Sequence, residues 1–267
     1  MATTVSKSRR LSNVKYLLWF ALSIVVVSLL LSWIVRFWIH LSLWKTFRRC
    51  VSIAAALMLW TFIRVVHGRS LRSFGLGAWR EGKRQLLQGI LLGCGAVLVI
   101  GGLYLVVGVC RISIHENHWH VGQTLIGFIP AVILIAVLEE LVFRGYVLQQ
   151  LLASSRRLAV FGSSLSYALV HLRPSMIWPG TALELIGLWI LGVVLAASYL
   201  RTKQLYLAVG LHAALAYFAR VNKLLVEFTN PSLQWLVGSN RLVNGVIAWL
   251  VLLGIGWVIS RRTRVTA

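Results

Sequence analysis

The stretch Ala136–Gly145, AVLEELVFRG, places two adjacent glutamates and an arginine inside a run of apolar residues. An ionisable group near the centre of a bilayer costs roughly 2.5–3.5 kcal/mol on insertion scales, so such a group faces the interior of a helical bundle and usually serves function. Glu139, Glu140 and Arg144 are therefore the first candidate functional residues.

The rest of the chain has the composition of a membrane protein. Of its 267 residues, 59% are hydrophobic and 12% are charged, whereas a soluble domain carries roughly a quarter charged residues. Several windows close to 20 residues long hold almost no charge, and a helix of that length spans a bilayer. The sequence predicts an all-α fold, a polytopic transmembrane helical bundle whose surroundings are the lipid bilayer.

Apolar runs predict about eight spans. Their expected limits are Tyr16–Leu41, Val51–Val66, Leu86–Cys110, Gln123–Leu151, Leu158–Leu172, Leu183–Leu200, Leu205–Val221 and Val243–Ser260. The fourth run is long enough to tilt or break, and Pro130 and Gly145 are natural places for a break.

The net charge of +21 is distributed in short basic clusters between the apolar runs. This pattern is typical of the positive-inside rule rather than of a nucleic-acid-binding surface, so no nucleic-acid partner is expected. If the N-terminus is cytoplasmic, the inner segments hold about twice as many Lys and Arg residues as the outer ones. Both termini are therefore predicted to be cytoplasmic. The first apolar run is too long for the core of a signal peptide and is interpreted as a retained span.

The spacing inside AVLEELVFRG separates the two glutamates. Glu140 and Arg144 are four residues apart, so they share one face of a helix, and Glu before Arg is the favourable order for an ion pair. Glu139 points about 100° away and cannot share the same arginine. An unpaired carboxylate in an apolar site suits a general acid or base. The alternative is that both glutamates belong to a polar clamp between helices.

Two histidines, His171 and His212, lie within or at the end of later apolar spans. A lone histidine in a membrane helix is more often a hydrogen-bonding residue between helices than a catalyst. Two of them on separate spans, together with a free glutamate, form a more specific set.

These residues resemble the CPBP family, the CAAX-protease and bacteriocin-processing (Abi-type) group of intramembrane proteases. EELVFRG matches the EExxxR motif of that family, and Tyr167–His171 matches its FxxxH motif with Tyr in place of Phe. The third motif is a histidine followed four positions later by Asn; His212 matches it, but Ala216 stands at the Asn position. The resemblance covers roughly residues 131–220.

The resemblance implies hydrolysis of a peptide bond by a glutamate-activated water. The family roles transfer to Glu139 as the base, to His171 as the residue that orients the water and to His212 as a donor to the oxyanion. Supporting residues are Glu140, Arg144 and Tyr167. An oxyanion donor is worth about 2.7–4 kcal/mol in other hydrolases, so the Asn missing at Ala216 must be replaced by Tyr217 or by a backbone amide.

The resemblance also implies a substrate and a setting. The substrate is a membrane-anchored or lipid-modified protein, or a leader or sorting peptide, and the protein is a multi-pass protein of the bacterial inner (cell) membrane. The chain divides into residues 1–122 with a basic tail and three spans, a catalytic core at 123–221, and residues 222–267 with a loop, the last span and a basic tail.

The metal question stays open at this point. Glu139, His171 and His212 could hold zinc with a water in the fourth position. The spacing, on three helices and without an HExxH motif, does not decide the matter. We expect no metal and no other cofactor.

Two other functions compete with the protease. The first is a non-catalytic membrane protein, for example an immunity or scaffold protein that retains the motif for stability, which Ala216 favours. The second is a proton-coupled transporter, because buried Glu and His residues also relay protons. The sequence has neither an inverted repeat nor paired interrupted helices, which transporters show.

Overall fold

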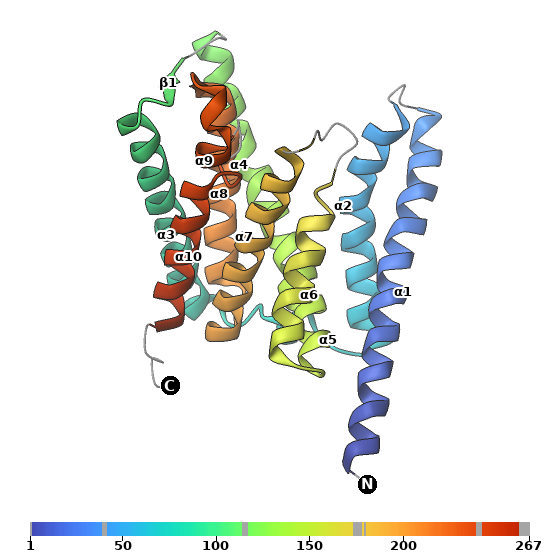
Figure 1. Cartoon of the computed structure of the whole chain (residues 1–267). Coiled ribbons are helices and arrows are strands. Elements are labelled where there is room, and N and C mark those ends of the chain that lie inside the picture. Colours follow the sequence, from blue (N-terminus) through green and yellow to red (C-terminus); the bar gives the residue numbers. More distant parts are fainter. Residues whose placement is uncertain are drawn as a thin grey trace.

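The computed structural model describes residues 2–38, 42–113, 117–172, 178, 180–238 and 242–261. Across these residues the chain is a bundle of helices that run mostly side by side (Figure 1). The α-helices are α1 (Ala2–Arg36), α2 (Leu43–Thr61), α3 (Trp79–Val106), α4 (His118–Glu140), α5 (Leu148–Leu152), α6 (Arg156–Leu169), α7 (Gly180–Thr202), α8 (Tyr206–Leu225), α9 (Gln234–Val237) and α10 (Val246–Arg261). The predicted all-α fold is confirmed.

Short elements join these helices. Two are π-helical, η1 (Phe62–Val66) and η3 (Leu141–Val147), and two are 3₁₀ helices, η2 (Leu71–Phe74) and η4 (Pro231–Leu233). Two three-residue strands, β1 (Cys110–Ile112) and β2 (Val226–Phe228), pair antiparallel with Arg111 opposite Glu227. This small two-stranded sheet, which the sequence did not predict, ties the segment after α3 to the end of α8.

Five helical segments of the described chain are long and apolar enough to cross a membrane. They are Ser12–Arg36, Leu43–Val66, Leu71–Val106, His118–Leu152 and Gly180–Thr202. The predicted number of about eight spans is not confirmed. The fifth predicted span, for instance, is α6, which has 14 residues and is about 21 Å long, against a hydrocarbon core of about 30 Å.

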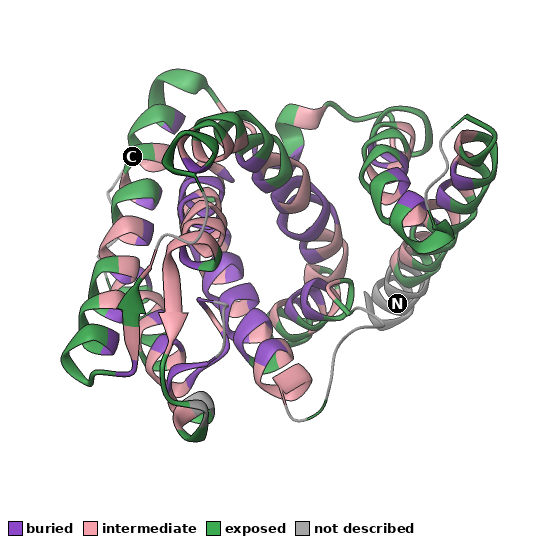
Figure 2. Ribbon diagram, turned by 90° about the horizontal axis from the view of Figure 1, so that it is seen from above, coloured by how far each residue is buried: buried purple, intermediate pink, exposed green. Residues whose placement is uncertain are grey.

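The distribution of apolar side chains on the outside and ionic ones inside is that of an integral membrane protein. Large apolar side chains such as Trp33 on α1 and Leu98 on α3 are exposed, and contiguous apolar surface of this kind faces lipid or a partner. Glu140 and Arg144, in contrast, are completely buried. Seen along the bundle, the exposed residues ring its outside (Figure 2).

The helices that carry the candidate residues pack at the centre of the bundle. α8 lies against α3 and α4, α6 lies against α7, and the α1–α2 pair stands at one edge (Figure 1). Close approach of α3 and α8 depends on glycine. A Cβ added at Gly210 would lie 2.2 Å from the carbonyl oxygen of Leu86, and one at Gly89 would lie 2.3 Å from that of Leu207.

Candidate active site

The two glutamates end α4, where the helix changes its hydrogen-bonding pattern. α4 passes through Pro130 without interruption and continues into the π-helix η3 at Leu141. The predicted irregularity is therefore at η3, which contains Gly145, and not at the proline. π-helical turns inside α-helices are frequent at functional sites.

Glu140 and Arg144 form a buried ion pair inside this turn. Arg144 Nη1 donates to Glu140 Oε1 over 2.9 Å, and both side chains are 0% exposed. The second terminal guanidinium nitrogen, Nη2, donates to the backbone oxygen of Gly192 in α7 over 3.1 Å. The guanidinium also lies 4.6 Å from the ring centre of Tyr167. Desolvated charges need such additional partners to be tolerated, so this group of contacts fixes η3 against α6 and α7.

His212 joins the same carboxylate from α8. Its Nδ1 donates to Glu140 Oε1 over 2.8 Å, so one carboxylate oxygen accepts from both the arginine and the imidazole. The opposite ring nitrogen, Nε2, lies 3.7 Å from Glu139 Oε2 and 3.5 Å from the Tyr167 hydroxyl. The contact with Glu140 therefore sets the orientation in which Nε2 faces Glu139.

His171 reaches the site from the end of α6. Its Nδ1 donates to the backbone oxygen of Tyr167 over 2.8 Å, and its Nε2 lies 3.9 Å from Glu139 Oε2. Because α6 has only 14 residues, its last turn ends within the depth of the bundle rather than at its far face. The short helix brings the ring of His171 to Glu139.

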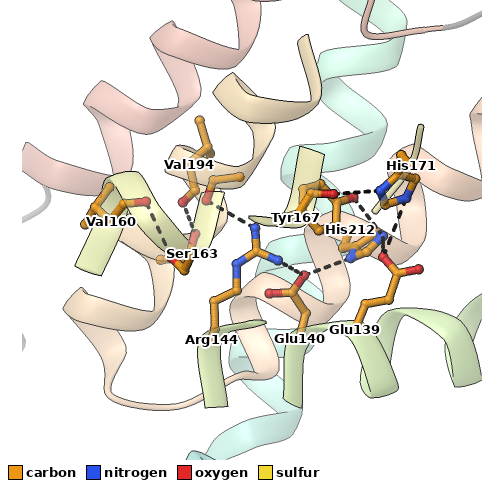
Figure 3. A network of polar contacts seen from close by, with 11 residues as sticks. Glu139, Glu140, Arg144, Val160, Ser163, Tyr167, His171, Val194 and His212 are labelled. Atoms are coloured by element: carbon orange, nitrogen blue, oxygen red, sulfur yellow. Dashed lines mark hydrogen bonds and ion pairs between the residues drawn. The ribbon is translucent and has the colours of Figure 1, made fainter. Parts of the chain in front are cut away.

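Glu139 is the carboxylate left without a direct hydrogen bond. Its side chain is 26% exposed, and among the described residues its Oε2 has no hydrogen-bond partner. Figure 3 shows Glu139, His171 and His212 pointing toward one another, from α4, from the turn after α6 and from α8. Separations of 3.7 and 3.9 Å exceed a direct hydrogen bond and suit contacts bridged by one water.

The residues that would hold a metal ion are these same three. Glu139 Oε2 and the Nε2 atoms of His171 and His212 form a carboxylate and two imidazoles facing a common point. Within the described part of the chain, no group of three or more His, Cys, Asp or Glu side chains has the geometry of a metal site.

One contributor to the site was missed at the sequence level, the backbone oxygen of Gly192, because a backbone atom carries no signal in the sequence. Tyr167 was expected as a supporting residue, and the structure places its hydroxyl 3.5 Å from His212 Nε2. A separate open groove, lined by Gln123, Thr124, Gly127, Phe128 and Arg220, lies nearer the start of α4 and includes none of the clustered residues.

Part of the chain matches a known protein family. Residues 121–218 match the sequence profile of the family described as Type II CAAX prenyl endopeptidase Rce1-like. The matched segment includes Glu139, His171 and His212 and ends within α8. No curated protein and no solved structure matches the chain.

Proposed function

Through residues 121–218 the chain belongs to the CAAX-protease (CPBP) family, and on that premise we propose that it is an intramembrane endopeptidase using a glutamate-activated water. The observation that carries the proposal is the position of Glu139 Oε2, 3.9 Å from His171 Nε2 and 3.7 Å from His212 Nε2. A carboxylate that pairs with no Lys or Arg among the described residues and is flanked by two oriented imidazoles is a suitable general base.

In the proposed first step, water attacks the carbonyl carbon of the scissile peptide bond. Glu139 accepts a proton from this water as the new C–O bond forms. The water is oriented by His171, whose Nδ1–H is engaged by the Tyr167 carbonyl, so that the Nε2 lone pair of the neutral ring faces the water. Glu139 then returns the proton to the amine nitrogen as the C–N bond breaks.

His212 serves as a donor to the oxyanion in this proposal. Its Nδ1–H is engaged by Glu140, so Nε2 can donate only when the ring carries a second proton. The carboxylates of Glu139 and Glu140, on either side of the ring, attract the positive charge of that imidazolium. Glu140 and Arg144 act indirectly by holding His212 in place.

The proposed substrate is a membrane-anchored or lipid-modified protein, or a leader or sorting peptide. The proposed setting is the bacterial inner membrane with both termini in the cytoplasm. Support for the first part comes from the CAAX prenyl endopeptidase description of the matched family and from a site built between helices that expose apolar surface. The distribution of basic residues supports the second part.

We also propose that no resident metal takes part. The test is the rate of cleavage after treatment of the purified protein with 1,10-phenanthroline or EDTA, followed by addition of Zn²⁺. The expected rate stays within about twofold of the untreated rate, because a glutamate base needs no Lewis acid. A loss that only added metal restores would assign Glu139, His171 and His212 as ligands.

The experiment that tests the function compares the termini of membrane proteins by mass spectrometry in the native host. Cells carry the wild type, Glu139→Gln or, as a matched control, Glu81→Gln, which alters a glutamate at the start of α3 outside the site. New termini are expected with the wild type and the control and not with Glu139→Gln, at equal abundance of all three proteins. Identical termini in all three strains would instead favour a non-catalytic immunity or scaffold protein.

A further inference from the structure

The hydroxyl group of Tyr167 is buried and makes one long hydrogen-bond contact. The side chain is 2% exposed, and the hydrogen-bond contact of its hydroxyl among the described residues is the one to His212 Nε2, at 3.5 Å. Strong hydrogen bonds of a hydroxyl group are about 2.7–2.8 Å long, and buried polar groups usually have such a partner. The Tyr167 hydroxyl is therefore available as a donor.

The position of this hydroxyl is fixed by the contacts of the rest of the residue. The ring stacks over the Arg144 guanidinium and meets the ring of Phe143 edge to face, with centroids 5.3 Å apart. The backbone oxygen of Tyr167 accepts from His171. A donor held by its surroundings needs little reorganisation when charge develops nearby, which is what makes such donors effective in catalysis.

The expected donor on α8 is absent. Ala216 follows His212 by four residues, about one turn, so its methyl group lies on the same helix face as the histidine. The alternative of Tyr217 fails on geometry, since five residues of helix turn its side chain about 140° from His212. Its ring packs instead near that of Phe218.

We propose that the Tyr167 hydroxyl is the second oxyanion donor, beside His212 Nε2. Two donors 3.5 Å apart can both reach one oxygen at about 2.7–3.1 Å, the distance that an oxyanion requires. The Tyr167 hydroxyl thus replaces the Asn side chain of the third motif, which Ala216 does not provide. This role rests on the proposed function, because it assigns a contact in the transition state of that reaction.

The test is a four-protein comparison of the wild type, Tyr167→Phe, Ala216→Asn and the double variant. The substrate is a reporter protein that contains a cleavage site. The site is chosen from those whose new terminus forms with the wild type and not with Glu139→Gln. Tyr167→Phe keeps the packed ring and removes only the hydroxyl, so kcat is expected to fall about 10²–10³-fold, the usual effect of losing one such donor. KM is expected to change less than about twofold, since the contact forms in the transition state.

Rescue separates a catalytic donor from a structural one. Ala216→Asn is expected to restore kcat of Tyr167→Phe at least about tenfold, while it changes kcat of the wild type less than about threefold. Tyr217→Phe, the matched control on the neighbouring position, is expected to behave as the wild type. Thermal melting of each purified protein accompanies the kinetics.

Each other outcome decides against the proposal. Normal kcat in Tyr167→Phe would show that the hydroxyl is not used. A reduced kcat with no rescue by Ala216→Asn would assign the hydroxyl to holding His212 rather than the oxyanion. If the wild type and Glu139→Gln leave the same termini, the proposed function itself fails and the donor role falls with it.

Discussion

Glu139 and Glu140 are neighbours in the chain with opposite environments. Glu140 is 0% exposed and bonded to Arg144 and His212 through one oxygen. Glu139 is 26% exposed and has the longer separations from His171 and His212. Because a helix turns about 100° per residue, one step along α4 moves the carboxylate from a salt-bridged interior to the centre of the histidine pair. The structural and the chemical role thus fall to different glutamates.

At the residue scale we predict a large loss of stability when the buried ion pair is broken. Arg144→Ala leaves Glu140 buried with only His212 as a partner, and the loss of one member of a buried pair costs about 3–5 kcal/mol. The expected result is a strongly lowered Tm of the detergent-solubilised protein and a reduced abundance in membranes.

The matched control for this prediction is the exposed ion pair of the two-stranded sheet. Arg111 and Glu227 are 2.9 Å apart with side chains 66% and 38% exposed, and exposed pairs contribute about 0–1 kcal/mol. Arg111→Ala is therefore expected to change Tm little. Equal losses in the two variants would show that burial does not decide the strength of these pairs.

At the scale of elements, the lengths and contacts of three helices assemble the site. α4 supplies both glutamates at its end, α6 stops early enough to present His171, and α8 brings His212 to Glu140. α8 in turn is held against α3 by close contact of the two backbones at Gly89 and Gly210. The position of His212 Nε2 therefore depends on glycines that lie outside the polar cluster.

We predict that Gly210→Ala lowers both stability and activity. The new methyl group would lie 2.2 Å from the Leu86 carbonyl oxygen, so α3 and α8 must separate, and overpacking of this kind typically costs about 1–3 kcal/mol. Movement of α8 also shifts His212 relative to Glu139. The measurements are Tm and the rate of reporter cleavage.

Gly101→Ala provides the comparison for Gly210→Ala. A Cβ at Gly101, which lies on α3, meets nothing within 4 Å, and alanine is favoured over glycine in a helix by about 1 kcal/mol. This variant is expected to keep or slightly raise Tm and to retain activity. If it lost as much as Gly210→Ala, the close contact between α3 and α8 would not be the cause.

At the scale of the whole molecule, the distribution of basic residues agrees with the position of the chain termini. α1 begins and α10 ends at the same end of the bundle, where the connections α2–α3, α5–α6 and α7–α8 also lie (Figure 1). These connections and the adjoining helix ends carry many of the basic residues, among them Arg69, Arg72, Arg80, Lys83, Arg84, Arg156, Arg157, Arg201 and Lys203. By the positive-inside rule this end is predicted to be cytoplasmic.

Labelling of single cysteines tests that orientation. In a background with Cys50, Cys94 and Cys110 replaced by alanine, Ile112→Cys places an exposed thiol on β1 at one end, and Ala153→Cys places one between α5 and α6 at the other. A membrane-impermeant maleimide added to intact cells is expected to label Ile112→Cys and to leave Ala153→Cys unlabelled until the cells are lysed. The reverse pattern would place both termini outside.

The native Cys110 is unsuited to this measurement. It lies on β1, outside the spanning segments, and burial raises the pKa of its thiol. Since the thiolate is the form that reacts with a maleimide, a raised pKa slows labelling at neutral pH. An introduced cysteine at exposed Ile112 avoids this ambiguity.

The sequence by itself determined the class of the protein and every contact that one helix can make alone. Apolar runs of near 20 residues require helices, because a lipid environment leaves backbone groups no other partners. The Glu140–Arg144 pair follows from the four-residue spacing, since helix geometry places these side chains on one face. The order of the three motifs likewise identified the segment that matches the CAAX prenyl endopeptidase family.

Only the tertiary structure decided how the separate helices meet. The bond between Glu140 and His212 joins residues 72 apart, and the contact between Tyr167 and His212 joins residues 45 apart. Neither contact follows from the spacing of residues along a single helix. The depth of His171 depends on where α6 ends. Against about eight spans expected from the sequence, five helical segments of the described chain are long and apolar enough to cross a membrane. The physical reason is that hydropathy records how apolar a segment is, whereas packing sets its end, its tilt and its neighbours.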